Sequence, residues 1–80
     1  MRPEDLLRAL HVQPFAPFRL HLTDGRSFDV SHPEFLMVTQ RVAHVGVYPT
    51  SPANGMMVFD YTETIALIHI VSLEPIAQNA

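Results

Sequence analysis

The sequence predicts a mainly β protein with one N-terminal helix, in which five strands form a small, strongly bent antiparallel barrel. Three observations support this prediction. A short amphipathic segment opens the chain, polar and apolar residues alternate after Pro17, and further apolar runs follow with short polar connections between them. Eighty residues make a single domain, 1–80, with the helix at 3–11, the barrel at 17–74 and a tail at 75–80.

The helix is predicted from its first turn. Pro3 suits the first helical position, and the carboxylates of Glu4 and Asp5 suit the positive end of the helix dipole. An apolar stripe follows, formed by Leu6, Leu7 and Leu10. Because so short a helix is marginal alone, we expect it to cover the core of the barrel.

The first two strands form a hairpin whose register follows from its turn. A two-residue turn at Asp24 and Gly25 would place Leu20 opposite Asp29, and would mix polar with apolar side chains on one face. A three-residue turn with Gly25 in the left-handed conformation instead pairs Leu20 with Phe28. We therefore predict the three-residue turn, with Asp24 and Gly25 as its structural residues.

The opposite face of this hairpin is polar. The same register places Arg19 opposite Asp29 and His21 opposite Ser27, which are pairs worth roughly 0.2–1 kcal/mol each. With His32 from the following corner, these side chains form a candidate exposed polar patch, which consists of Arg19, His21 and His32.

A proline marks the next feature, because Pro33 cannot donate to a sheet and should bend the chain. The strand is expected to resume at 35–38, which makes the second strand long and bent. Two more strands are expected at 42–48 and 56–61, on either side of a loop at 49–55.

The run 64–73 is apolar on both alternating faces except at His69 and Ser72, which predicts a last strand covered on both sides. Such a strand can associate with a neighbouring molecule by its edge or by its apolar side chains. The candidate oligomer interface consists of Ile68, His69 and Ile70.

Composition favours self-association. Apolar residues make up 48% of the chain and charged residues only 16%, which is more apolar surface than a lone small domain easily buries.

The absence of cysteine excludes disulfides and thiolate zinc sites. Five arginines against eight acidic residues give a formal net charge of −3, so nucleic-acid binding is not supported by charge.

We expect a cytoplasmic protein without a membrane association. No apolar run approaches the roughly 20 residues that span a bilayer. Residues 1–10 carry four charged side chains where a secretory signal would have an apolar core.

Motifs of catalysis are missing from the sequence. There is no cysteine nucleophile, no Gly-x-Ser-x-Gly elbow and no glycine-rich phosphate loop. Five histidines raise the hypothesis of a metal site, but each stands alone on its own segment. They are His11, His21, His32, His44 and His69. We therefore expect no enzyme activity and no cofactor.

Two segments carry a resemblance to a known family. "PFAPFRLHLTDGRSFDVSHPEFL", followed later by "IALIHIVSLEP", resembles a family of short uncharacterised bacterial proteins. These proteins share a Pro-Phe-x-Pro-Phe entry, an Asp-Gly-Arg hairpin and a His-Pro-Glu-Phe corner. The likeness is close over 14–36 and loose over the last strand. It implies a fold and assigns no chemistry.

A helix followed by five strands is also similar, more distantly, to the Sm-like and SH3-like small barrels. The first Sm motif has a glycine where Gly25 stands, and apolar residues at the positions of Leu20, Leu22, Phe28 and Val30. This resemblance implies a barrel and ring assembly.

The RNA site of that family is not carried over. Asp29 stands near the place of its second glycine, and 32–38 holds no counterpart of its RNA-contacting Asp and Asn. Thr62-Glu63-Thr64 replaces its basic residue and glycine before the last strand.

These observations predict a non-catalytic, homo-oligomeric binding or scaffold module, in which a ring is one form of assembly. Two alternatives stay open. One is a single-stranded RNA-binding Sm-like protein, and the other is a small-ligand or metal-binding module.

Overall fold

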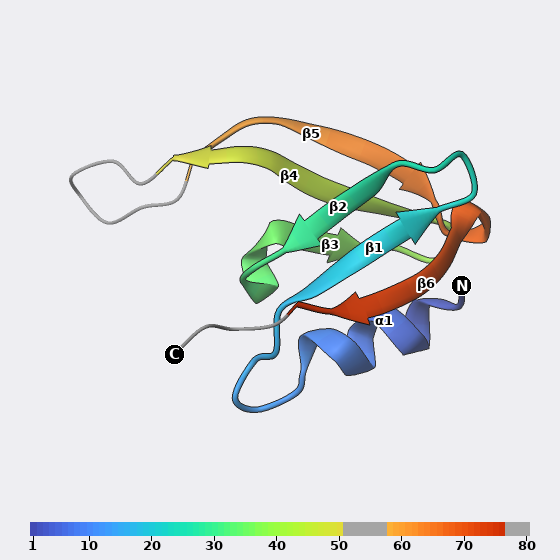
Figure 1. Ribbon diagram of the computed structural model, residues 1–80, viewed down its shortest axis with the longest axis horizontal. Helices are drawn as coiled ribbons and strands as arrows, with labels where there is room; N and C mark the ends of the chain where they lie inside the picture. Colours follow the sequence, from blue (N-terminus) through green and yellow to red (C-terminus); the bar gives the residue numbers. More distant parts are fainter. Residues whose placement is uncertain (51–57, 77–80) are drawn as a thin grey trace.

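Two three-stranded antiparallel sheets and one helix make up the computed structural model, which describes residues 1–50 and 58–76 (Figure 1). The first sheet has the order β2-β1-β6, with strands Ser27–Val30, Phe18–Leu22 and Ile70–Pro75. The second sheet has the order β3-β4-β5, with strands Leu36–Val38, Val42–Thr50 and Val58–Ala66. The mainly β class with an N-terminal helix is confirmed.

The helix α1, Pro3–Leu10, ends one residue before the predicted position. Leu6 and Leu10 are buried, while Leu7 is 40% exposed, so the buried stripe is narrower than predicted. The N-terminal ammonium group of Met1 donates a hydrogen bond to the carbonyl oxygen of Leu67 at 2.7 Å. This bond ties the start of α1 to the segment before β6. Within 1–50 and 58–76, no helix has the length and apolar character needed to cross a bilayer.

The hairpin of β1 and β2 has the predicted register. Leu20 pairs with Phe28, and Arg19 pairs with Asp29. The amide nitrogen of Gly25 donates to the carbonyl oxygen of Leu22 at 3.1 Å, and the φ angle of Gly25 is 89°. A left-handed glycine in a three-residue turn therefore sets the two faces of the hairpin.

The prediction of one long, bent second strand is wrong. The chain leaves β2 at Val30 and makes a short 3-10 turn, η1 (Pro33–Phe35). It then enters β3, which pairs with β4 in the second sheet. Pro33 has no amide hydrogen to give to a ladder, so the strand ends at this corner instead of bending through it.

The prediction of one continuous last strand is also wrong. The chain ends β5 at Ala66 and makes a second 3-10 turn, η2 (Leu67–His69), before β6 begins. The amide nitrogen of Thr23 donates to the carbonyl oxygen of His69 at 2.9 Å, which fastens this turn to the first hairpin.

The described residues therefore form six strands instead of five, and the two sheets do not close into a barrel. On one side β5 and β6 do not pair, and on the other side β3 is only three residues long and pairs with β4 no further than Val45. Beyond that residue, nothing in the described chain joins the second sheet to β2. The seam between the sheets stays open.

The core lies between the two sheets, and α1 covers it beside β6 (Figure 1). Leu6, Leu20, Val30 and Val45 are its largest fully buried side chains. Burial of each such side chain contributes about 1.5–3 kcal/mol. The described residues include no buried polar or charged side chain, so the core is held by apolar contact alone.

Two predicted features fall partly outside the described residues. Of the predicted loop 49–55, Pro49 and Thr50 belong to β4, and the remainder lies outside. Of the predicted tail 75–80, Pro75 is the last residue of β6, and 77–80 lies outside.

Candidate functional site

The outer face of the first sheet carries a connected set of charged side chains. Nε of Arg19 donates to Oδ1 of Asp29 at 2.6 Å, and Nη1 of Arg19 lies 3.8 Å from Oε1 of Glu74. Nε2 of His21 lies 2.8 Å from the same oxygen of Glu74. The hydrogen bond and the charge of Asp29 raise the pKa of Arg19 above its ordinary value. The guanidinium group is therefore already paired with carboxylates.

His32 lies apart from this charged set. Its ring contacts Phe35 edge-on, with 5.2 Å between ring centroids, at the corner that follows β2. Of the three residues in the predicted polar patch, the structure brings Arg19 and His21 together through Glu74, and leaves His32 elsewhere.

The predicted turn residues have a structural role in the hairpin. Oδ1 of Asp24 accepts a hydrogen bond from the backbone nitrogen of Arg26 at 3.0 Å, and Oδ2 accepts one from its Nε at 2.8 Å. These two bonds lower the pKa of the Asp24 carboxyl. No atom lies within 4 Å of the place where a Cβ atom on Gly25 would stand, so space does not exclude a side chain here. The turn needs glycine because its φ angle is positive.

The three predicted interface residues occupy different environments. Ile70 is only 3% exposed and belongs to the core, whereas Ile68 is 80% exposed. Nδ1 of His69 lies 3.3 Å from Oγ1 of Thr23 at the surface. Of the two isoleucines, only Ile68, which lies within η2, has an exposed side chain.

The histidines of the described chain do not converge on a metal site. Within 1–50 and 58–76, no group of three or more His, Asp or Glu side chains is arranged to hold a metal ion. His44 has a separate partner, with Nδ1 3.0 Å from Oγ1 of Thr64.

The edges of β6 and β5 are among the sheet edges that pair with no other strand in the described chain. In the described residues β6 pairs only with β1, and β5 pairs only with β4. The carbonyl oxygen of Ile70 accepts from the ammonium group of Met1 at 3.4 Å, and the other outer backbone groups of both strands have no strand partner in the described chain. Exposed apolar side chains lie near them, with Ile68 and Val71 by β6 and Val58 on β5.

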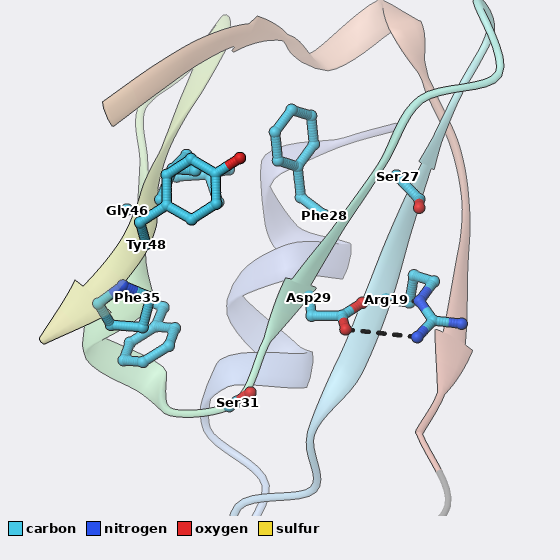
Figure 2. A pocket seen from close by; sticks show the side chains of 11 residues that line it. Arg19, Ser27, Phe28, Asp29, Ser31, Phe35, Gly46 and Tyr48 are labelled. Atoms are coloured by element: carbon cyan, nitrogen blue, oxygen red, sulfur yellow. Dashed lines mark hydrogen bonds and ion pairs between the residues drawn. The ribbon is translucent and has the colours of Figure 1, made fainter. Parts of the chain in front are cut away.

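A third feature is a cleft at the open seam between the sheets, which we call the seam cleft (Figure 2). Its volume is about 470 Å³, within the range of ligand sites. Eleven residues line it, from β1, β2, η1, β4 and the residue after β2: Arg19, Ser27, Phe28, Asp29, Ser31, Phe35, Val45, Gly46, Val47, Tyr48 and Pro49.

Tyr48 gives the seam cleft its most unusual geometry. Its φ angle is 54°, in the left-handed region that bulky residues rarely adopt. The side chain is 67% exposed, and its ring lies 6.0 Å from that of Tyr61 on the neighbouring strand. Figure 2 shows the rings of Tyr48 and Phe28 on the two sides of the cleft. Neither residue belongs to the polar patch or to the interface that the sequence predicts.

A glycine supports the same region. Phe59 lies over Gly46, where a Cβ atom would be too close to its ring, and meets Phe35 edge-on at 5.0 Å. A lone glycine in a valine-rich strand is the sequence signal for such close approach, and it could have marked this region.

A separate hollow of about 570 Å³ lies beside the start of the chain. Arg2, Gln40, Arg41 and Ile68 are among the residues that line it. Arg2 lies within 4 Å of Glu4 and Asp5 carboxylates, while Arg41 has no such carboxylate neighbour in the described chain. Four of the five arginines thus lie near carboxylates, which weakens any attraction for phosphates.

Comparison of the chain with models of protein families, with curated proteins and with solved structures finds no match.

Proposed function

We propose that the protein is a non-catalytic module that associates with copies of itself through the edge of β6 and the side chain of Ile68. The observation that carries this proposal is the coincidence of an open strand edge with an exposed apolar residue at its start. Proteins usually protect such edges with charge, proline or a covering segment. In the described part of the chain β6 carries Glu74 and Pro75 at its end, but Val71 near its start is exposed.

The complementary surface is the open edge of β5 in a second copy. A contact between two different edges is heterologous, and it generates a ring if the rotation closes. The high apolar content supports association, because an 80-residue chain buries a smaller share of its surface than a larger domain does.

Introduction of a charged side chain at the proposed contact tests this function. Ile68→Glu and Val71→Lys should each shift the chain to smaller species in native mass spectrometry. Both residues are exposed, so the free energy of unfolding should change by no more than about 0.5 kcal/mol. Met37→Glu is the matched control, because Met37 is 66% exposed and lies on β3, away from β6. Unchanged assembly in both the Ile68→Glu and the Val71→Lys variant would reject the proposal.

A second candidate function is binding of single-stranded RNA. Its support is the hollow where Arg2 and Arg41 lie together, since small β domains bind single strands through arginines and stacking side chains. Fluorescence anisotropy with a labelled uridine oligonucleotide tests it. Binding that weakens with salt and is lost in Arg41→Gln would support this function over a scaffold that binds no RNA.

The relation to Sm-like proteins is a further part of this proposal. β1 pairs with the last strand, and a 3-10 turn joins β5 to β6, which supports an opened relative of that fold. Membership of the short bacterial family and a location in the cytoplasm stay predictions from the sequence.

A further inference from the structure

One wall of the seam cleft is the free edge of β2. The amide nitrogen of Leu22 donates to the carbonyl oxygen of Arg26 at 2.9 Å, which sets the bonded positions of the hairpin. These positions alternate in an antiparallel pair, so the backbone groups of Phe28 point to β1. Those of Ser27 and Asp29 point away from β1. Because both residues line the cleft, their backbone groups face the edge that it borders.

The other wall is the edge of β4 beyond Val45, where η1 packs against β4 but no strand pairs with it. β5 pairs with β4 as far as Thr50, but β3 stops pairing at Val45. The side of Gly46–Thr50 that faces away from β5 therefore has no strand partner in the described chain. β2 and β4 run in roughly the same direction on the two sides of the cleft (Figure 2). One strand antiparallel to β2 would also be antiparallel to β4.

The side chains within the cleft are mainly apolar. Phe28, Phe35 and Val45 line it, and Phe35 and Val45 are almost fully buried. The polar groups at β2 include the hydroxyl of Ser31 and the Arg19–Asp29 ion pair, whose charges compensate each other. This arrangement suits a strand with apolar side chains on one face, and it provides no concentrated charge for a polyanion.

We propose that the seam cleft binds an extended segment of a partner protein, which adds as an antiparallel strand between β2 and β4. The segment carries apolar side chains at alternate positions, facing Phe28 and Phe35, and no net charge. Paired free edges favour polypeptide over a small molecule, because they offer repeating donors and acceptors on both sides. The site is independent of the proposed self-association, since it uses neither the β6 edge nor the outer β5 edge.

A capped hexapeptide of alternating valine and threonine is the probe for this site. At millimolar concentration it should shift the backbone amide resonances of Ser27, Asp29, Gly46 and Val47, and slow the hydrogen exchange of the Ser27 and Asp29 amides. The same peptide with N-methylated valines keeps the side chains but loses every second backbone donor. It should bind at least about tenfold more weakly.

Variants of the protein test the β2 wall separately. Ser27→Pro removes an amide hydrogen that points away from β1, at the first residue of an edge strand, where proline is tolerated. It should weaken peptide binding about tenfold, while Ser27→Ala, which keeps the amide hydrogen, should bind as the wild type does. If Ser27→Pro fails to fold, the N-methylated peptide alone decides.

Three results would overturn the proposal. The first is no binding of the hexapeptide, and the second is equal binding of its N-methylated form. The third is a shift of the Ser27 and Asp29 amides on raising the protein concentration without peptide, which would assign the cleft to a second copy.

Discussion

Replacement of Gly46 by alanine should destabilise the protein, although the same change in an ordinary strand stabilises. Glycine inside a strand costs about 0.5–1 kcal/mol relative to alanine, so the backbone favours the substitution. The new Cβ atom, however, would overlap the ring of Phe59, which is held edge-on by Phe35. Overpacking of this kind costs about 1–3 kcal/mol. The net result is a loss of up to about 2 kcal/mol.

A double-mutant cycle isolates this contact. In a Phe59→Ala background the obstacle is gone, and Gly46→Ala should then stabilise the protein by about 0.5–1 kcal/mol. The assay is urea unfolding of the four proteins, with the midpoints compared at equal slopes. The sign of the Gly46→Ala effect should reverse between the two backgrounds. A higher midpoint for Gly46→Ala alone would refute the placement of Phe59 over the glycine.

Further predictions concern the turn, the segment before β6 and two titrating groups. Gly25→Ala should lower the free energy of unfolding by about 1–2 kcal/mol in thermal melts, because its φ of 89° disfavours a Cβ atom even in open space. Ile70→Ala should cost about 2–5 kcal/mol in urea unfolding and Ile68→Ala less than about 0.5, and equal costs would contradict the placement of Ile70 in the core. The folded-state pKa of Asp24 is lowered, so its contribution is present above about pH 4 and is lost as the pH falls through the folded value. Melting temperatures from pH 6 to pH 2 should therefore fall less steeply for Asp24→Asn than for the wild type, whereas parallel curves would contradict this linkage. Desolvation and the neighbouring Tyr48, Glu63 and Asp60 raise the pKa of Tyr61 above 10.0, so an ultraviolet titration should show a late phase that Tyr61→Phe removes.

The first hairpin could be predicted in detail because its information is local. Leu20 and Phe28 share an apolar face only in one register, and that register requires a left-handed residue where Gly25 stands. The information that predicts the helix is equally local, since Pro3 and two carboxylates mark its start. Leu7 differed from expectation because its exposure depends on which elements pack against α1.

Strand ends were harder to predict because they depend on distant partners. Pro33 indicated that the strand is interrupted. Whether the chain bends within one sheet or enters the other depends on the residue that Leu36 pairs with, and that residue is Val45 on β4. The run 64–73 carried no proline or glycine to mark η2. Ile70 was therefore assigned to the candidate interface together with Ile68, although its side chain belongs to the core.

The seam cleft could not be predicted from the sequence. It exists because two sheets fail to join, which is a property of β3 being short and of β2 ending at a corner. The positive φ of Tyr48 has no signature in its residue type, and Gly46 was the only local mark of close packing at this place.

The most direct measurement for the proposed self-association is sedimentation velocity of the unmodified chain from micromolar to hundred-micromolar concentration. Association through β6 predicts a defined multimer whose fraction rises with concentration and falls in Ile68→Glu. A single species at the 9.0 kDa mass of the monomer over the whole range would contradict it.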